Sequence, residues 1–248
     1  MAESIASTAL NALEFLPEFG ISLESDKKDY YATNLEYTGT AIWFGGKNLA
    51  TFAKDNVTKF TQKSVLELGS GTGIVGIALA KHLFEKEATE LGDPYLLTDG
   101  FEKVVEMLSN NCRNNEVKIK CELLRWNEGE DIQKLQRTYV DGFDCILGAD
   151  LYYNRSQGDV VRNIFATVAA LLSHDPHAAF YLSVTRRDLD INTVLDIATD
   201  AGFSHELAED YVWDIFDNNT DGMTEFWRDA IYIFRRSTAP LLSTSSSP

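Results

Sequence analysis

The stretch from Ser64 to Phe84, SVLELGSGTGIVGIALAKHLF, decides the fold. Its first part, SVLELG (64–69), is a short apolar run ending in glycine, which is typical of a buried strand. Its last part, GIVGIALAKHLF (73–84), is an apolar run that predicts a helix. The glycines between them permit a tight turn and leave no Cβ in the way of a ligand. The amides at the start of such a helix favour an anionic group, so this turn is a candidate binding site.

The segments that follow repeat the alternation of strand and helix. We expect strands at 95–99, 117–124, 144–150 and 178–184, and helices at 42–55, 101–115, 160–172 and 189–202. FSHELAED and AIYIFRR (230–236) predict two final strands, with the loop WDIFDNNTDGMTE and no helix between them. This order predicts an α/β fold with a Rossmann-like, seven-stranded, mostly parallel sheet, an antiparallel C-terminal strand pair and helices on both faces.

The domain organisation follows from the same reading. Residues 1–37 are expected to form an N-terminal extension without clean periodicity, residues 38–236 one domain, and residues 237–248 (STAPLLSTSSSP) a disordered tail. No apolar run approaches the roughly 18 to 20 residues of a membrane helix. The first residues lack the basic start of a secretory signal, so we expect a cytoplasmic protein and leave the nucleus open.

The composition excludes several classes of protein. The chain has 248 residues, 44% of them hydrophobic, and only 5 prolines, which is typical of a folded protein with one sizeable core. With 22 Lys and Arg against 38 Asp and Glu, the net charge of −16 argues against duplex DNA or bulk RNA as a partner. A basic polypeptide is the easier partner, although the acidity could serve solubility alone.

Three cysteines, Cys112, Cys121 and Cys145, show no metal-binding spacing and are expected to be reduced thiols. We expect no metal site. Asp217 to Gly222 copies half of a calcium loop, but Arg228 stands where the bidentate glutamate is needed.

The glycine loop alone leaves several interpretations open. Gly71, Gly73 and Gly76 satisfy the dinucleotide pattern GxGxxG, and Asp99 follows Gly71 by 28 residues at the end of the next expected strand. An acidic side chain there could bind a ribose, as in an NAD enzyme or an S-adenosylmethionine (SAM) site. The glycines could also serve only the tight turn between strand and helix.

Residues beyond these glycines favour SAM. The pattern Glu67-x-Gly69-x-Gly71-x-Gly73 resembles motif I of class I SAM-dependent methyltransferases. Within that superfamily the chain resembles the seven-β-strand protein-lysine methyltransferases, the methyltransferase-like group (methyltransferase family 16) acting on non-histone proteins. The resemblance spans roughly residues 38–236 and depends on the order of five stretches: TGTAIWFGG, ELGSGTGIVG, LLTD, LRW and GADLYY.

The resemblance implies a set of cofactor-binding residues, namely Trp43, Glu67, Gly69, Ser70, Gly71, Asp99, Trp126 and Ala149. Gly69, Ser70 and Gly71 would line the methionine and ribose part of SAM, and Asp99 would accept hydrogen bonds from the ribose. Trp126 would pack near the adenine, Trp43 would close the pocket, and Ala149 would lie under the cofactor. The two tryptophans could instead be core aromatics, and Asp99 could be a helix cap.

The resemblance also implies two catalytic residues. Asp150 and Tyr153 form the family's D-x-x-Y motif, here Asp150-Leu-Tyr-Tyr153. A lysine ammonium has no lone pair at neutral pH and must lose a proton before it can accept a methyl group. Asp150 would attract and orient the amine, either as the base or only as its guide, and Tyr153 would flank it. The Asp/Asn-Pro-Pro-Tyr motif of amide and base methylation differs, because Leu151 and Tyr152 replace its prolines.

These features together predict a SAM-dependent protein-lysine N-methyltransferase acting on a non-histone protein. The resemblance leads us to expect a translation factor or a chaperone as substrate, and a monomeric enzyme. Three alternatives stay open: a methyltransferase acting on a small amine or RNA, a non-catalytic binding module with the same fold, and an NAD-dependent dehydrogenase.

Overall fold

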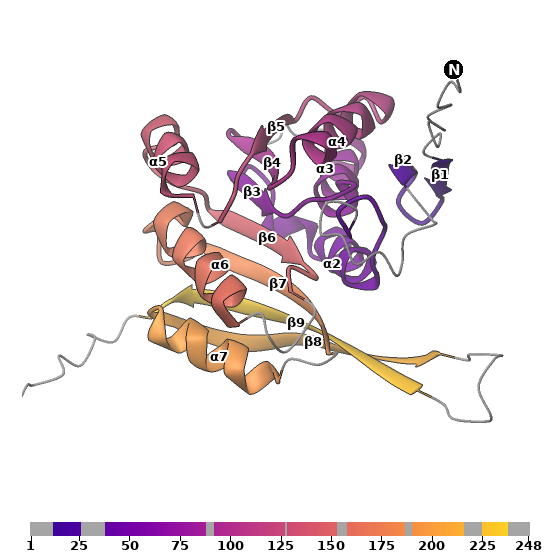
Figure 1. Cartoon of the computed structure of the whole chain (residues 1–248). Coiled ribbons are helices and arrows are strands. Elements are labelled where there is room, and N and C mark those ends of the chain that lie inside the picture. The colour runs from indigo at the N-terminus through magenta and orange to yellow at the C-terminus, as the bar shows by residue number, and fades with distance from the viewer. Residues whose placement is uncertain are drawn as a thin grey trace, which may run out of the picture.

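A seven-stranded sheet forms the centre of the molecule in the computed structural model (Figure 1). The structure describes residues 12–25, 38–87, 92–126, 128–152, 158–186, 190–215 and 225–237. The strands are β3 (Val65–Leu68), β4 (Tyr95–Asp99), β5 (Lys120–Leu123), β6 (Cys145–Ala149), β7 (Ala179–Arg186), β8 (Phe203–Ile215) and β9 (Glu225–Arg236). Their order in the sheet is β5-β4-β3-β6-β7-β9-β8. The first five strands are parallel, and β9 runs antiparallel to both β7 and β8. The fold expected from the sequence is therefore confirmed.

Helices cover both faces of the sheet (Figure 1). They are α2 (Phe44–Asp55), the 3₁₀ turn η1 (Val57–Lys59), α3 (Ile74–Glu87), α4 (Glu102–Asn114), α5 (Gly129–Thr138), α6 (Gly158–Leu171) and α7 (Ile191–Asp200). Apolar side chains of α2, α3 and α4 build one core, and those of α5, α6 and α7 build the other. Successive strand residues alternate between the cores, as Val65 and Leu66 do. Within the described ranges, no helix is long and apolar enough to cross a membrane.

The order of the strands reverses at β3, which lies between β4 and β6. Chain segments leaving the carboxyl ends of these strands diverge to opposite sides, which opens a crevice at this edge of the sheet. The glycine loop after β3 and the residues after β4 and β6 meet there. The topology thus determines where a ligand can bind.

The two C-terminal strands are longer than expected. The sequence predicted a loop from Trp213 to Glu225, but β8 continues to Ile215 and β9 begins at Glu225. Antiparallel pairing continues through Trp213 opposite Trp227, because neighbouring antiparallel strands satisfy each other's backbone groups even where the sequence is rich in Asp. The pair extends beyond the rest of the sheet as an arm (Figure 1).

Within the described residues, the sequence reasoning missed an N-terminal hairpin, the 3₁₀ turn η1 and helix α5. An N-terminal hairpin, β1 (Ala12–Leu16) and β2 (Ile21–Ser25), lies within the stretch interpreted as lacking periodicity. Ile21 and Leu23 are fully buried in the core shared with α2, α3 and α4. The alternation in ISLES was a usable strand signal, but it is only five residues long. Helix α5 was also missed, because only Leu135 of its residues is buried and its apolar pattern is sparse.

Candidate active site

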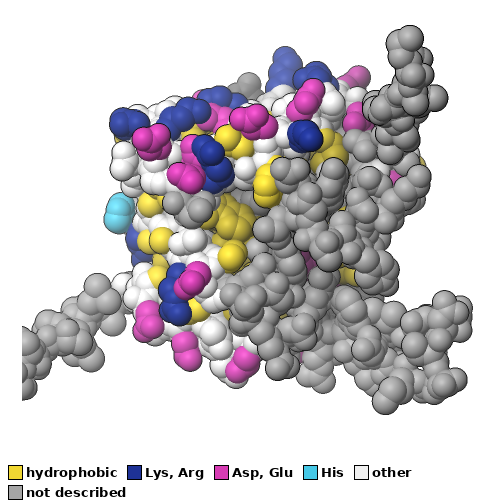
Figure 2. All heavy atoms as spheres, in the orientation of Figure 1, with side chains coloured by type: hydrophobic (Ala, Val, Ile, Leu, Met, Phe, Trp, Pro, Cys, Tyr) yellow, Lys and Arg dark blue, Asp and Glu magenta, His cyan; other side chains and the backbone are white. Residues whose placement is uncertain are grey.

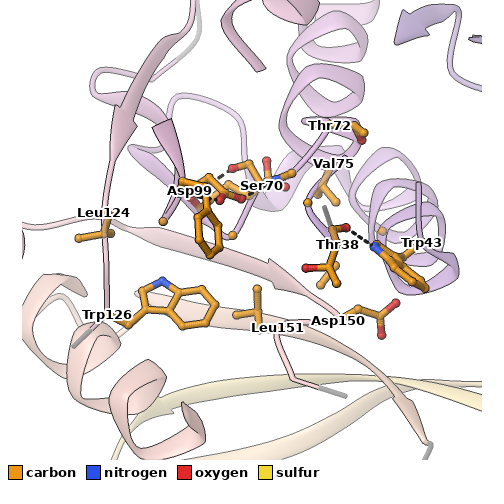
Figure 3. Close-up of a pocket in the computed structure, with 18 of the residues that line it drawn as sticks. Thr38, Trp43, Ser70, Thr72, Val75, Asp99, Leu124, Trp126, Asp150 and Leu151 are labelled. Atoms are coloured by element: carbon orange, nitrogen blue, oxygen red, sulfur yellow. Dashed lines mark hydrogen bonds between the residues drawn. The ribbon is translucent and has the colours of Figure 1, made fainter. Parts of the chain in front are cut away.

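A pocket of about 650 Å³ opens at the carboxyl ends of β3, β4 and β6 (Figure 3). Nine of the residues singled out in the sequence line it: Trp43, Glu67, Gly69, Ser70, Gly71, Asp99, Trp126, Ala149 and Asp150. They come from segments more than 100 residues apart. The tenth, Tyr153, lies outside the described residues, as does the calcium-like stretch 217–222.

The glycine loop forms one wall of the pocket in a backbone conformation that favours glycine. Gly69 and Gly71 have φ values of 57° and 53°. A Cβ at Gly71 would lie 2.8 Å from the carbonyl oxygen of Gly39, and a Cβ at Gly69 would lie 2.8 Å from the Leu151 side chain. Left-handed φ values and close neighbours both exclude larger residues. The loop therefore presents bare main chain to the pocket.

Asp99 holds this loop against the next strand. One carboxylate oxygen accepts the Gly71 N–H at 3.1 Å and the other accepts the Phe101 N–H at 3.2 Å. Only 7% of the residue is exposed, and burial raises its pKa. The N-cap of α4 is Phe101, and no described side chain caps this helix with a hydrogen bond, so the interpretation of Asp99 as a helix cap was wrong. Asp99 lines the pocket instead.

Glu67 connects the two ends of the glycine loop. It is 3% exposed, and its carboxylate accepts the N–H of Gly76 in the first turn of α3 at 2.9 Å. Burial raises the pKa of Glu67 to about 8, although the Gly76 bond acts in the opposite direction. A carboxyl group in this position links the end of β3 to the helix that follows the loop.

Aromatic side chains form the remaining walls. Trp43 directly precedes α2, and its Nε1 donates to the carbonyl oxygen of Thr38 at 2.8 Å. Trp126 lies on the opposite side with its indole plane along the pocket (Figure 3). Its Nε1 is buried and no acceptor for it exists among the described residues. Both tryptophans line the pocket rather than lying wholly in the core, and a buried donor without a partner favours a ligand with an acceptor.

Asp150 lies in the part of the pocket nearest α2. Its φ of 50° is left-handed, which is strained for a residue with a side chain. One carboxylate oxygen accepts the Gly45 N–H at 3.0 Å, and the other accepts the Thr185 N–H at 3.1 Å. A Cβ at Gly45 would lie 2.6 Å from the first oxygen. Asp150 thus binds the first turn of α2 and the end of β7 together, and each oxygen keeps a lone pair for a further donor.

A buried polar pair lies behind Asp150. Asn48, on α2, donates from Nδ2 to the carboxylate of Asp229, which is 1% exposed on β9. Asp229 stands opposite Thr185 in the β7–β9 register, so the pair adjoins the residue whose N–H binds Asp150. Sequence reasoning missed both residues, because nothing in the local sequence distinguishes them from surface polar residues.

Much of the pocket lining was not among the predicted site residues. The additional residues are Thr38, Gly39, Ala41, Gly46, Thr72, Ile74, Val75, Gly100, Phe101, Leu124, Arg125, Glu128, Leu151, Val160 and Asn163. Several are sequence neighbours of predicted residues and could have been inferred from them. Val160 and Asn163 belong to α6 and come near only through packing.

The sequence is similar to a known protein family and to several known proteins. The family model described as lysine methyltransferase matches residues 25–198. The chain is 30% identical to protein-lysine N-methyltransferase EFM3 of Chaetomium thermophilum over 67% of this chain and 48% of that protein. It is 28% identical to calmodulin-lysine N-methyltransferase of Arabidopsis thaliana over 76% of this chain and 61% of that protein. The chain spans only about half to three fifths of the length of these relatives.

The fold also matches solved structures at low sequence identity. A S-adenosylmethionine-dependent methyltransferase from Clostridium acetobutylicum superposes with a TM-score of 0.52 and 11% identity, over 77% of this chain and 92% of that one. Such a likeness supports the architecture of the sheet and its helices.

Proposed function

The chain belongs to the lysine methyltransferase family, and we propose that it is an S-adenosylmethionine-dependent protein-lysine N-methyltransferase acting on a non-histone protein. One observation carries this proposal: a single pocket joins the glycine loop and Asp99 to Asp150 at the reversal of strand order. Binding of a cofactor and orientation of an acceptor can therefore occur in one cavity.

The residues present fit S-adenosylmethionine. A cavity of about 650 Å³ lies within the range of small-ligand sites. The bare backbone at Gly69 and Gly71 leaves room for close approach, and Asp99 supplies acceptors for ribose hydroxyls. The unpartnered Nε1 of Trp126 supplies a donor beside the aromatic wall. The sulfonium of the bound cofactor would supply an electrophilic methyl group.

Asp150 is suited to orienting an amine. The N–H groups of Gly45 and Thr185 hold its two oxygens in place, so the carboxylate is preorganised before a substrate arrives. The remaining lone pairs can accept hydrogen bonds from a lysine amine and direct the nitrogen lone pair toward the methyl group. The aromatic walls exclude water, which disfavours the charged ammonium. We propose Asp150 as the orienting residue and Tyr153 as its flanking partner.

The proposed substrate is a protein with a lysine in basic surroundings. Residues 206–225 contain seven Asp and Glu and no Lys or Arg. The chain enters this acidic stretch from β8 and leaves it in β9, which pairs with β7 near Thr185. By contrast, the described surface in Figure 2 intersperses Lys and Arg with Asp and Glu. Attraction between the acidic stretch and a basic partner would favour a substrate with Lys and Arg around the acceptor. A translation factor or chaperone substrate, a cytoplasmic location and a monomeric state belong to this proposal.

Two measurements, made one after the other, test the proposal. Calorimetry with S-adenosylhomocysteine (SAH) and with NAD should show binding of the first only; the reverse result would indicate a dehydrogenase. Cell extract is then incubated with labelled SAM and the protein. The labelled macromolecules should lose their label on treatment with protease and keep it on treatment with ribonuclease. Asp150→Ala serves as the blank. Label sensitive to ribonuclease, or confined to small molecules, would contradict a protein substrate.

The methylated residue requires a separate measurement. Mass spectrometry of lysine methylation, in cells with and without the gene, should find at least one lysine that loses methylation when the gene is absent. Identical lysine methylation in the two extracts would count against a lysine acceptor.

A further inference from the structure

Two cysteine thiols that do not line the pocket contact each other. Cys112 lies on α4 and Cys121 on β5, and their sulfur atoms are 3.7 Å apart. Both are free thiols, as is Cys145 on β6. Because the contact spans a helix and an adjacent strand, one thiol can reach the other without unfolding either element.

The two thiols differ in their access to solvent. Cys112 is 3% exposed, whereas Cys121 is partly exposed. Cys121 lines a shallow hollow of about 370 Å³ that is separate from the pocket described above. The hollow is lined by Val105, Lys120, Cys121, Glu122, Leu123, Lys134 and Thr138. A small reagent can therefore reach Cys121 from solvent, while Cys112 stays behind it.

Local electrostatics also distinguish the two thiols. The hydrogen bond shared with Cys112, in which either sulfur can be the donor, lowers the pKa of Cys121. The positive charge of Arg113 acts to lower the pKa of both thiols. The same hydrogen bond, together with burial, raises the pKa of Cys112. Thiolates are the reactive form of cysteine, so the lowered pKa and the partial exposure of Cys121 both favour reaction at this sulfur. Burial raises the pKa of Cys145, which makes that thiol the natural internal control.

We propose that Cys121 and Cys112 are an oxidisable thiol pair, in which a peroxide reacts at Cys121 and Cys112 closes a disulfide between β5 and α4. In the first step the Cys121 thiolate attacks a peroxide oxygen: an S–O bond forms, the O–O bond breaks, and the departing hydroxide is protonated to water. In the second step Cys112 attacks the Cys121 sulfur: the S–S bond forms, the S–O bond breaks, and hydroxide leaves with the Cys112 proton as a second water. Two thiols lose two electrons, and one peroxide gains them.

The disulfide would act on the glycine loop through α4. Its sulfurs must approach by roughly 1.6 Å, because a disulfide bond is about 2.05 Å long. Asn111, next to Cys112, donates from Nδ2 to the carbonyl oxygen of Thr72 in the loop at 2.9 Å. The side chain of Leu108, one turn earlier on α4, lies 2.5 Å from the position that a Cβ on Gly73 would occupy. Displacement of α4 therefore reaches the loop through a direct hydrogen bond and a packing contact.

Mass spectrometry tests the thiol pair. Wild-type protein treated with one equivalent of hydrogen peroxide should lose two hydrogen atoms, and the peptides containing Cys112 and Cys121 should become linked, reversibly with a dithiol. Cys145→Ser should behave like the wild type. Cys112→Ser, or Cys112→Ala if the first variant folds poorly, should instead accumulate sulfenic acid at Cys121, detected with a dimedone probe. Oxidation of Cys145 in preference to Cys121 would overturn the proposal. So would sulfinic acid at Cys121 in the wild type without any linked peptide.

A binding measurement tests the effect on the loop, which rests on the proposed function. Calorimetry should show SAH binding about 5-fold or more weaker to the disulfide form than to the reduced form. In Cys112→Ser, which cannot form the disulfide, peroxide treatment should leave the SAH affinity unchanged. An unchanged affinity in the disulfide form would refute the coupling. Absence of SAH binding to the reduced protein would count against the proposed function, because disulfide formation itself needs no cofactor.

Discussion

Asp99 and Asp150 both stand at the carboxyl ends of strands, and each accepts two backbone N–H groups, but their donors come from different distances along the chain. Asp99 binds Gly71 and Phe101, which belong to the loop after β3 and to the residues directly after Asp99. Asp150 binds Gly45, 105 residues away, and Thr185, 35 residues away. The contacts of Asp99 thus span at most 28 residues and join β4 to the loop of the neighbouring strand β3, whereas the longest contact of Asp150 spans 105 residues and exists only after α2 has packed beside β6 and β7.

This difference predicts that substitutions near Asp150 and near Asp99 have separable effects. Substitutions near Asp150 should lower the rate of methyl transfer without changing cofactor affinity. Substitutions in the glycine loop should act mainly by lowering cofactor affinity. The following predictions run from the largest expected effect to the smallest.

Asp150→Ala should lower the rate of methyl transfer about 100-fold or more, because the amine loses its oriented acceptor. SAH affinity, measured by calorimetry, should stay within about 2-fold of the wild type if the two sides of the pocket are independent. Asp159→Ala removes an exposed carboxylate on α6 and is the matched control. Undiminished transfer in Asp150→Ala would remove Asp150 from the proposed mechanism.

Gly71→Ala should weaken SAH binding by about 10-fold or more. The left-handed φ alone costs about 1–2 kcal/mol with a side chain, and the new Cβ would press on the carbonyl oxygen of Gly39. Gly202→Ala is the control for backbone strain, because Gly202 has a φ of 87° and no heavy atom near its Cβ position. If both variants lose stability but only Gly71→Ala loses affinity, the loop geometry serves the ligand. Equal SAH affinities in the two variants would contradict that role.

Gly45→Ala should lower transfer about 10-fold and leave SAH affinity unchanged. A Cβ would lie 2.6 Å from a carboxylate oxygen of Asp150, so the carboxylate must move away from its position. Gly129→Ala, at the start of α5 with open space around its Cβ position, controls for the loss of a helical glycine. A parallel loss of cofactor affinity in Gly45→Ala would show that the two sides of the pocket are coupled.

Asn48→Ala should lower the free energy of unfolding by about 1–3 kcal/mol, because the buried carboxylate of Asp229 loses a donor. Urea denaturation measures this change, and Asn192→Ala, at an exposed position of α7, provides a surface comparison. Transfer should fall less than in Gly45→Ala, since the N–H groups that bind Asp150 remain. A stability equal to the wild type would mean that the Asn48–Asp229 pair contributes nothing to holding α2 on β9.

Glu67→Gln should change mainly the pH dependence of stability. Because burial raises the pKa of Glu67 to about 8 in the folded state, the folded protein binds more protons than the unfolded chain between pH of about 4.5 and 8. Stability contributed by this group is present at low pH and is lost as the pH rises through that window, by up to about 1.4 kcal/mol per unit. Denaturation curves at several pH values should show a shallower decline in Glu67→Gln. A steeper decline would contradict this assignment.

Much of the architecture was readable because its signals are local. The run from Ser64 to Phe84 contains a strand, a turn and a helix in sequence order, and the structure has β3 and α3 there. Asp99 could be singled out because it ends the next strand. The ends of β8 and β9 were misjudged, since pairing between two strands overrode the loop-forming composition of each one.

The sequence by itself determined the α/β fold, the position of the glycine loop and the residue types that surround it, because backbone freedom at glycine and the periodicity of apolar residues act over a few neighbouring positions. Only the tertiary structure decided what binds Asp150, which residues support it, and that Cys112 and Cys121 touch. Those contacts join elements far apart in sequence, and packing and backbone pairing between the elements, rather than any local preference, bring them together.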